Sequence, residues 1–355
     1  MQLQVNLPDN AYELVIEKNR LSQVGDWVAS LWDNRQIVII SDETVASLYG
    51  ESVLKSIEEK GFNTSLVTVP PGEESKSLLQ AEKLYHDLAE KGMTRKDGII
   101  LLGGGVVGDL GGFVASTYMR GLSFLQIPTT LLAQVDSSIG GKTAVNTSLA
   151  KNLVGSFAQP DGVLIDPMTL ETLEDRRLRE GLAEVVKSAA ILDKELWHLL
   201  SEMADEYEAL ENAEAIIYAC CHIKRQVVEQ DEKDHGVRLL LNFGHTMGHA
   251  IEQTQGYGVV SHGEAVAIGM CQLTKVAEDK GLTQVGTLDK LVQLLETFHL
   301  PTGLENWDEE KMYQALTHDK KTRGNQIKLI VLKEIGEAFI ETIQLEEMTD
   351  YLSRS

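Results

Sequence analysis

Short apolar runs alternate with an amphipathic stretch in the first half of the chain, and this order limits the possible folds more than any other feature. We expect strands at residues 35–40, 64–69, 98–102, 122–127 and 162–165, and a helix at residues 77–91. Strands that alternate with helices in this way predict a parallel sheet with helices on both faces.

The periodicity changes after Asp166-Pro167. Later segments have helical spacing and are rich in Ala, Leu, Glu and Lys, at residues 170–191, 195–230, 244–255, 263–280 and 287–298. One late run, Gln326–Leu332, has the pattern of a strand, so either the second half is not purely helical or this run returns to the sheet. A length of 355 residues exceeds one ordinary core, so we expect two domains, residues 1–170 and 171–355, with the active cleft between them.

Charge and cysteine content restrict the partners. The 32 Lys and Arg residues stand against 54 Asp and Glu residues, and the net charge of −22 repels polyanions and argues against nucleic acid. Cys220, Cys221 and Cys271 are too few and too unevenly spaced for a disulfide framework or a CxxC metal knuckle. The chain has neither a signal-peptide pattern nor an apolar run long enough for a membrane span. We therefore expect a cytoplasmic protein with no membrane association.

A glycine-rich loop follows the third expected strand. Gly103, Gly105 and Gly108 satisfy the G-x-G-x-x-G pattern between a predicted strand and a predicted helix. Such glycines let backbone N–H groups approach a pyrophosphate, and the following helix N-terminus favours negative charge. This context favours a dinucleotide site over a tight packing turn. Because the usual fingerprint follows the first strand, the other end of the cofactor would be held by earlier turns, at Asp42 and Pro71–Lys76.

Three acidic and imidazole side chains on separate predicted helices form a candidate metal set. Glu184 lies on a helix otherwise full of small and apolar residues, and His245 and His249 are four residues apart, each with a glycine before it. The sequence Ser261–Glu264 is a capping box, which fixes His262 in the first turn of the next helix. A Glu/His/His set with an open fourth position suits the polarisation of an alcohol or carbonyl oxygen. Three unrelated polar residues remain the alternative.

Basic residues gather beside these same motifs although the chain is acidic. Each alone would be a surface charge, but together they suit a substrate with more than one anionic group, such as a phosphate and a carboxylate. They are Arg120, Lys142, Lys151, Lys187, Lys224, Arg238, Lys320 and Lys321.

Five strings together resemble the bacterial 3-dehydroquinate synthases of the sugar phosphate cyclase family. They are QVDSSIGGKTAVN (134–146), AKNLVGSF (150–157), GLAEVVK (181–187), LNFGHTMGHAIE (241–252) and HGEAVAIGM (262–270). The resemblance runs through nearly the whole chain. Ala150 stands where Gly is common, and Asp234 stands where Glu is usual, which changes the reach of that side chain but not its charge.

This resemblance implies a Rossmann-like N-terminal domain, a mostly α-helical metal-binding domain, bound NAD+ and a homodimer. It places zinc or cobalt on Glu184, His245 and His262. The implied dinucleotide contacts are Asp42, Pro71, Gly72, Glu73, Glu74, Ser75, Lys76, Gly105, Val106, Val107, Gly108, Asp109, Thr129, Thr130, Lys142, Lys151, Thr169, Leu170, Glu171 and Thr172. The implied substrate contacts and catalytic residues are Arg120, Asp136, Lys142, Asn152, Lys187, Lys224, Arg238, Asn242, His249 and one of Lys320 or Lys321.

The reaction implied by the resemblance converts 3-deoxy-D-arabino-heptulosonate 7-phosphate to 3-dehydroquinate and phosphate. It is a step of the shikimate route to chorismate and the aromatic amino acids. NAD+ transiently oxidises an alcohol of this small phosphorylated sugar acid, phosphate leaves by β-elimination, the hydride returns, and an intramolecular aldol reaction closes the ring. Lys142, Asn152 and Arg120 would hold the phosphate, and the sequence leaves open whether Arg120 comes from the partner subunit.

Three other functions compete with this interpretation. A metal-dependent NAD polyol dehydrogenase would share the two-domain plan, but a neutral polyol needs no clamps for phosphate and carboxylate. A sister cyclase whose substrate lacks a carboxylate would leave Arg238 without a partner. A regulatory NAD-binding module would need no metal set. Peptidase chemistry is set aside because Thr246 stands where an HExxH helix needs its Glu.

Overall fold

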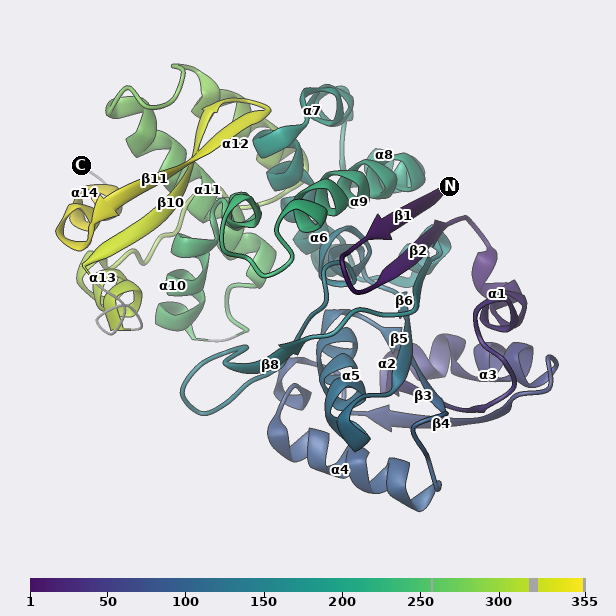
Figure 1. Ribbon diagram of the computed structural model, residues 1–355. Helices are drawn as coiled ribbons and strands as arrows, with labels where there is room; N and C mark the ends of the chain where they lie inside the picture. The colour runs from purple at the N-terminus through teal and green to yellow at the C-terminus, as the bar shows by residue number, and fades with distance from the viewer. Residues whose placement is uncertain (257, 319–324, 354–355) are drawn as a thin grey trace. The chain divides into compact units, whose positions relative to one another are not determined.

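The computed structural model describes residues 1–256, 258–318 and 325–353, apart from the side chain of His318. The chain forms two compact units, Met1–Leu173 and Glu174–Ser355 (Figure 1). The boundary expected at residue 170 falls in a 3-10 helix, Pro167–Thr172, at the end of the first unit.

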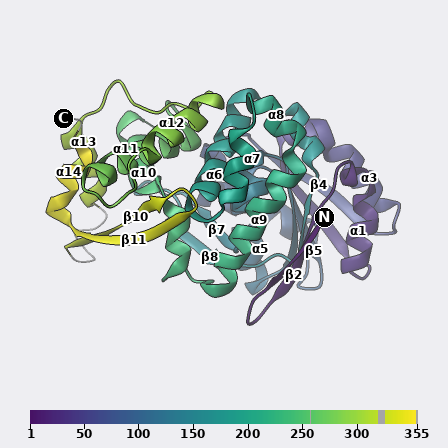
Figure 2. The same ribbon diagram turned by 90° about the horizontal axis from the view of Figure 1, so that it is seen from above.

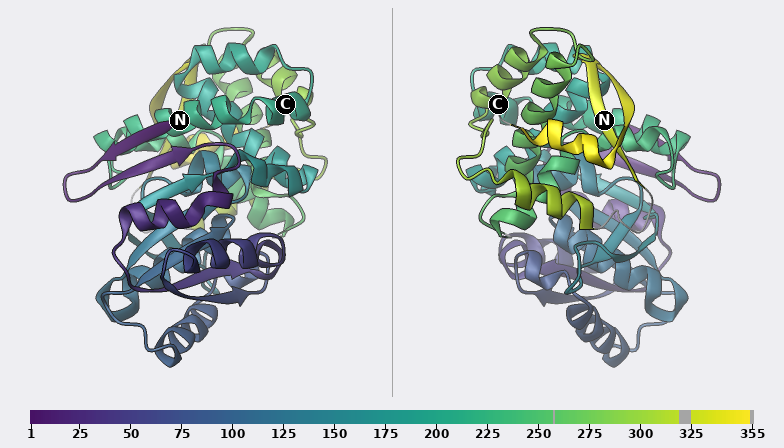
Figure 3. Two further views of the ribbon diagram at one scale, coloured as in Figure 1. Left: turned by 90° about the vertical axis from the view of Figure 1, so that its right-hand side faces the viewer. Right: turned by 90° about the vertical axis from the view of Figure 1, so that its left-hand side faces the viewer.

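The first unit, which is described throughout, is built on a seven-stranded sheet of order β1-β2-β9-β6-β5-β3-β4. The strands are β1 (Gln2–Asn6), β2 (Ala11–Ile16), β3 (Gln36–Asp42), β4 (Asn63–Val69), β5 (Gly98–Gly103), β6 (Ser123–Pro128) and β9 (Gly162–Ile165). From β2 to β4 every pairing is parallel, so the parallel sheet is confirmed and all five expected strands form. The β1–β2 hairpin, purple in Figure 3, was not expected, and it adds one antiparallel edge strand.

Helices cover both faces of this sheet. On one face lie α1 (Val24–Leu31) and α3 (Glu51–Glu58), and on the other lie α4 (Leu78–Glu90) and α5 (Gly105–Thr117). In β3, Ile37 and Ile39 pack toward the first pair, whereas Val38 and Ile40 pack toward the second. Because the strand is buried on both faces, its sequence is a continuous apolar run without alternation.

A second hairpin, which the sequence analysis did not predict, packs along α5. It consists of β7 (Lys142–Val145) and β8 (Val154–Phe157), paired antiparallel. The hydroxyls of Ser116 in α5 and Ser156 in β8 are 2.7 Å apart. The hairpin therefore fixes the segment that carries Lys142, Lys151 and Asn152.

The second unit is mostly helical. Its helices are α6 (Asp175–Leu192), α7 (Lys194–Ser201), α8 (Glu206–Glu211), α9 (Ala213–Gln230), α10 (His245–Gln255), α11 (His262–Asp279), α12 (Thr287–Thr297), α13 (Glu309–His318) and α14 (Met348–Leu352). The helical pattern expected at residues 195–230 forms three helices, α7, α8 and α9. Asp205 begins α8 by accepting hydrogen bonds from the backbone N–H groups of Tyr207 and Glu208, so the segment is divided. No helix in the described part of the chain is long and apolar enough to cross a membrane.

The late strand pairs within the second unit. The strands β10 (Gln326–Glu334) and β11 (Glu337–Gln344) form a two-stranded antiparallel sheet, drawn in yellow in Figure 2. Of the two alternatives left by the sequence, the second half is therefore not purely helical, and the run does not return to the large sheet.

A buried carboxylate joins three helical segments of the second unit. Glu206 in α8 is 1% exposed and accepts hydrogen bonds from Arg179 Nε and Nη2 in α6, at 2.9 and 2.6 Å. Its other oxygen lies 2.7 Å from His299 Nδ1, just after α12. Burial raises the pKa of Glu206, but its backbone N–H, Arg179 and His299 lower it by more, so the net direction is downward.

We expect Glu206→Ala to lower the free energy of unfolding by about 2 kcal/mol at neutral pH, because it removes the charged acceptor of Arg179. Because the folded-state pKa is lowered, this contribution is present above the ordinary value of 4.5 and fades as the pH falls through the lower folded-state value. Urea titrations of wild type and variant over this range measure both effects. The exposed control Glu195→Ala should change stability by less than about 0.5 kcal/mol, and an equal loss in the control would contradict the assignment.

Candidate functional site

Three predicted metal ligands meet inside the second unit. Glu184 comes from the middle of α6, and His245 and His262 are the first residues of α10 and α11. The Nε2 atoms of the two histidines lie 3.4 and 3.7 Å from Glu184 Oε1. Side chains 61 and 17 residues apart in sequence thus form one cluster that could hold a metal ion.

The donor atoms of this cluster fit a divalent metal ion. Glu184 is 1% exposed, and its Oε1 has no hydrogen-bond partner among the described residues. A buried carboxylate oxygen without a partner is costly, unless a cation binds it. Zinc bonds of about 2.0–2.1 Å at tetrahedral angles separate ligand atoms by roughly 3.3 Å, which is close to the observed distances. Three protein donors leave a fourth position for a substrate oxygen.

The Nδ1 atoms of His245 and His262, which face away from Glu184, also have hydrogen-bond partners. Nδ1 of His245 lies 3.2 Å from the Phe243 carbonyl oxygen, and Nδ1 of His262 lies 3.1 Å from Glu252 Oε2. Both contacts require a proton on Nδ1, which leaves the Nε2 lone pairs directed at the cluster. Glu252 was not singled out from the sequence, although it follows His245 by seven residues on the same helix.

Burial and neighbouring charges set the protonation of the cluster. Burial lowers the pKa of His245 well below its ordinary value, and the nearby Lys187 adds to this effect. Burial also lowers the pKa of His262, but the hydrogen bond to Glu252 and the charge of Glu184 outweigh it, so that pKa is raised. Lys187, itself 1% exposed, bonds the second oxygen of Glu184. A neutral His245 can offer its lone pair to a metal at neutral pH.

Two glycines bring the ligand-bearing helices into close contact. A Cβ on Gly263 would lie 2.5 Å from Glu180 Cα in α6, and one on Gly269 would lie 2.3 Å from the Gly244 carbonyl oxygen. Neither position has room for a side chain. The backbone of α11 therefore packs directly on α6 and on the start of α10, which places the imidazoles beside Glu184.

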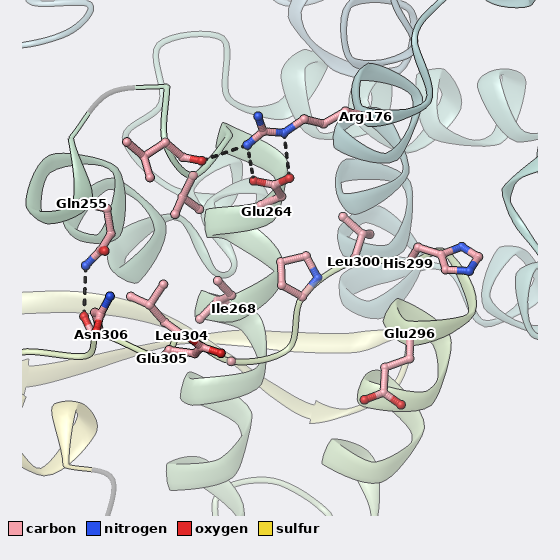
Figure 4. A pocket seen from close by; sticks show the side chains of 14 residues that line it. Arg176, Gln255, Glu264, Ile268, Glu296, His299, Leu300, Leu304, Glu305 and Asn306 are labelled. Atoms are coloured by element: carbon pink, nitrogen blue, oxygen red, sulfur yellow. Dashed lines mark hydrogen bonds and ion pairs between the residues drawn. The ribbon is translucent and has the colours of Figure 1, made fainter.

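The predicted capping box at the start of α11 is confirmed. The Ser261 hydroxyl accepts from the Glu264 N–H, and Glu264 Oε2 accepts from the Ser261 N–H at 2.8 Å. Arg176 in α6 binds the same carboxylate with Nε and Nη2, at 2.9 and 2.8 Å (Figure 4). Burial raises the pKa of Glu264, and the bonds from Arg176 and Ser261 lower it by more. This clamp fixes the first turn of α11, where His262 lies.

A cavity of about 780 Å³ lies beside this clamp in the second unit. Arg176 and Glu264 line one side of it, and Ile268, Leu300 and Leu304 contribute apolar side chains (Figure 4). None of the site residues predicted within the described ranges is among its lining residues. This cavity therefore does not coincide with the predicted metal ligands.

Three predicted substrate cations of the second unit are buried. Lys187, Lys224 and Arg238 are 1%, 7% and 2% exposed, although such side chains are almost never fully buried without partners. Arg238 donates from Nη1 to the Glu232 carbonyl oxygen at 2.5 Å. Arg238 is therefore a buried cation and not an exposed surface charge. Asn242 ends the same 3-10 helix, Val237–Asn242.

Asp231 anchors the loop that leads to Arg238, and it was missed in the sequence. Its carboxylate accepts from the backbone N–H groups of His235, Gly236 and Arg238, at 3.0, 2.6 and 3.1 Å. Burial raises the pKa of Asp231, and these three bonds lower it by more. These donors lie four to seven residues after Asp231, beyond the i+2 spacing of an Asx turn, so no local pattern marks this residue in the sequence.

In the first unit, the predicted dinucleotide segments follow the carboxyl ends of five parallel strands. Asp42 ends β3, residues 71–76 follow β4, residues 105–109 follow β5, Thr129 and Thr130 follow β6, and residues 169–172 follow β9. These ends meet at one edge of a parallel sheet, where ligands of such folds bind. Gly104, the N-cap of α5, offers no side-chain acceptor, so the first N–H groups of this helix are available to an anion. Asp42 also caps α2 (Glu43–Val45) through Thr44 and Val45.

Side-chain bonds join these segments to the β7–β8 hairpin. Lys76, 5% exposed, pairs with Asp109 in α5. Asn146, which was missed in the sequence, donates from Nδ2 to Glu73 Oε1 at 2.7 Å and accepts from the Asn152 N–H at 2.9 Å. The turn after β4 is therefore tied to the loop that carries Asn152.

The remaining predicted residues differ in where they lie. Arg120 is exposed on a 3-10 helix, Tyr118–Arg120, after the end of α5. A helix of 13 residues is about 20 Å long, so Arg120 lies at the far end of α5 from Gly105. Asp136 lies in a π-helix, Ala133–Ser137, after β6. The ring of His249 is exposed and lies 5.7 Å from that of His245. Lys320 and Lys321 lie outside the described residues.

The fold is that of the sugar phosphate cyclases. A 2-deoxy-scyllo-inosose synthase, solved with carbaglucose-6-phosphate, NAD+ and Co2+, superposes with a TM-score of 0.90 at 24% identity and 99% coverage of both chains. A 2-epi-5-epi-valiolone synthase from Streptomyces hygroscopicus, solved with NAD+ and Zn2+, has a TM-score of 0.88 at 28% identity, covering 98% of this chain and 97% of that one.

Sequence comparison places the chain in one family of this class. The family models described as 3-dehydroquinate synthase N-terminal and C-terminal match residues 66–180 and 181–322. The chain is 62% identical to a 3-dehydroquinate synthase of Enterococcus faecalis, over 100% of this chain and 99% of the relative. It is 57% identical to that of Streptococcus mutans, over the whole of both chains. The chain belongs to the 3-dehydroquinate synthase family, which confirms the resemblance.

We expect Gly263→Ala to weaken both stability and zinc binding, because its Cβ must push α11 away from Glu180 and move His262 from Glu184. Such overpacking costs about 1–3 kcal/mol of unfolding free energy. Urea titration and elemental analysis after dialysis measure the two effects. Gly303→Ala is the matched control, since nothing lies within 4 Å of its Cβ position. Full zinc retention by Gly263→Ala would show that this contact does not position the ligands.

Proposed function

We propose that the chain converts 3-deoxy-D-arabino-heptulosonate 7-phosphate to 3-dehydroquinate and phosphate, as a lyase of the shikimate pathway. The observation that carries the proposal is the Glu184/His245/His262 cluster, in which the Glu184 carboxylate is buried with Lys187 against it, in a chain whose relatives of 55–62% identity are 3-dehydroquinate synthases. The three buried cations predicted as substrate contacts in the second unit, Lys187, Lys224 and Arg238, support a substrate with several anionic groups in a chain of net charge −22.

The first unit would bind NAD+ and the second a divalent metal ion. The N-terminus of α5 would bind the pyrophosphate, and the segments at residues 71–76, 129–130 and 169–172, with Asp42, Lys142 and Lys151, would hold the rest of the dinucleotide. Glu184, His245 and His262 would hold zinc or cobalt. When bound, NAD+ supplies a reversible hydride acceptor and the metal supplies Lewis acidity toward a substrate oxygen.

The chain's own residues would bind and orient the substrate. Arg238, fixed by the loop on Asp231, is a planar donor suited to a carboxylate. Lys142 and Asn152 would hold the phosphate, and the hydrogen bond from Asn152 to Asn146 supports that loop. The further contacts proposed for substrate are Asp136, Lys187, Lys224, Asn242, His249 and one of Lys320 or Lys321.

A cytoplasmic homodimer completes the proposal. All three cysteines are buried thiols, as is usual in a reducing compartment. Arg120 is exposed at the far end of α5 from the glycine-rich loop, so its guanidinium is accessible to a partner subunit. Arg120 of one subunit would contact the substrate phosphate bound in the other, and a two-fold dimer would make this contact mutual.

The competing dehydrogenase function has weaker support. A glycerol dehydrogenase from Schizosaccharomyces pombe superposes with a TM-score of 0.66 at 16% identity, covering 96% of this chain and 87% of that one. This likeness concerns the fold alone. Buried Lys187, Lys224 and Arg238 have no use with a neutral polyol, since cations are buried at the expense of their hydration.

The reaction itself gives the sharpest test. Purified protein should release inorganic phosphate from the heptulosonate phosphate only when NAD+ and a divalent metal are present, and chelation should stop the release until zinc or cobalt is restored. NADH absorbance should not accumulate, because oxidation and reduction occur in one turnover. A build-up of NADH equal to substrate consumed would favour the dehydrogenase. Turnover of a heptulose phosphate that lacks the carboxylate, at the same rate, would favour a sister cyclase.

The two neighbouring histidines of α10 should have different roles. We expect His245→Ala to lose both bound metal and activity, because its Nε2 faces Glu184. His249→Ala should keep the metal, yet lose activity by about 100-fold as expected for a substrate-contacting group. Elemental analysis after dialysis, together with phosphate release, separates the two outcomes. Equal metal loss in both variants would show that His249 is also a ligand.

A further inference from the structure

Glu252 lies on the same face of α10 as the two histidines of that helix. His245, His249 and Glu252 are spaced i, i+4 and i+7, which aligns them in one stripe. Glu252 is 4% exposed, and its Oε2 lies 3.1 Å from Nδ1 of His262 in α11. One helix thus carries a predicted metal ligand and a carboxylate that contacts another ligand.

The two ring nitrogens of His262 have different surroundings. Its Nε2 lies 3.7 Å from Glu184 Oε1, within the metal cluster, and its Nδ1 faces Glu252 on the other side. An ionised carboxylate only accepts hydrogen bonds, so Nδ1 carries the proton and Nε2 keeps its lone pair. We propose that Glu252 is a positioning residue, which fixes the tautomer and orientation of His262 for metal binding. This inference rests on the proposed function of the cluster.

His262 needs such a partner more than His245 does. The side chain of His245 is 13% exposed, and its Nδ1 is held by the carbonyl of Phe243, two residues earlier in its own turn. The side chain of His262 is 31% exposed and begins its helix. A more exposed ring retains more rotational freedom, and Glu252 limits this freedom from a neighbouring helix. The negative charge of the carboxylate also makes the imidazole a stronger ligand.

A direct ligand role for Glu252 is the alternative, because His249, Glu252 and His262 also form a group that could hold a metal. That site would use Nδ1 of His262, whose proton must then be lost while Nε2 serves the first cluster. The 3.1 Å separation is a hydrogen-bond distance and is shorter than the roughly 3.3 Å between donors that share tetrahedral zinc. We therefore expect one metal ion per chain.

The test measures metal affinity, without the need for turnover. The zinc dissociation constant is determined by chelator competition for wild type, Glu252→Ala and Glu252→Gln, and the exposed neighbour Gln253→Ala is the matched control. Loss of a carboxylate behind a ligand histidine weakens metal binding by about 10–100-fold, which we expect for Glu252→Ala. Glu252→Gln keeps an acceptor oxygen but loses the charge, so a roughly 3–10-fold loss is expected. Gln253→Ala should bind zinc as wild type does.

A second readout reports on the ligand geometry. In the cobalt-loaded protein, the visible absorption bands depend on how the ligands are arranged around the ion, and they should shift in Glu252→Ala and Glu252→Gln but not in Gln253→Ala. If Glu252→Ala does not fold, Glu252→Gln carries the test alone.

Unchanged zinc affinity and unchanged cobalt bands in both Glu252 variants would overturn the proposal. So would an equal loss in Gln253→Ala, or a fall from two metal ions to one, which would make Glu252 a ligand. The variant Glu184→Gln, measured in the same assay, separates failure of the role proposed for Glu252 from failure of the metal site itself. If wild type and Glu184→Gln both bind no zinc, the metal site itself is wrong. If only Glu184→Gln loses zinc, the site stands and the role of Glu252 fails.

Discussion

The second unit depends on the burial of one carboxylate, that of Glu184. Removal of such a group from water costs several kcal/mol unless its charge is compensated. Lys187 compensates one oxygen, whereas the other faces two imidazole nitrogens without a hydrogen bond. The close contact of α11 with α6 at Gly263 allows one oxygen to lie within 4 Å of nitrogens from two further helices. Stability and the ability to bind a cation therefore have the same structural origin.

Local patterns predicted the parts of the fold in which burial dictates the residue type. Strand β3 could be predicted because Ile37–Ile40 is apolar on both faces, and the start of α11 could be predicted because its capping box is written in four consecutive residues. The break at Asp205 could not, since amphipathic spacing continues through the cap and only tertiary packing decides where the chain turns. The β1–β2 hairpin could have been predicted, because polar and apolar residues alternate strictly over Gln2–Asn6 in β1.

The residues of the candidate site also fall into two groups, those that local sequence patterns identified and those that they did not. Glu184, His245 and His262 could be selected because each has an unusual local setting. Glu252, Asp231 and Asn146 were missed because their function in the structure is to bond other site residues, and the bond from Asn146 to Glu73 joins positions 73 residues apart in the sequence. A side chain that acts through another leaves little trace in its own neighbourhood. For Glu252, the available signal in the sequence was its position seven residues after His245, on the same face of the helix.

The acidic character of the chain does not oppose binding of an anionic substrate. At physiological ionic strength the Debye length is about 8 Å, so acidic groups spread over the surface act weakly at a distance. Buried cations such as Lys187, Lys224 and Arg238 are screened much less. Arg120 differs from these because it is exposed, and α5 separates it from the glycine-rich loop by about 20 Å. In the proposed dimer, Arg120 would contact the substrate phosphate of the partner subunit. In a two-fold dimer each site would then lack a cation until the partner arrives, and anion binding would be coupled to assembly.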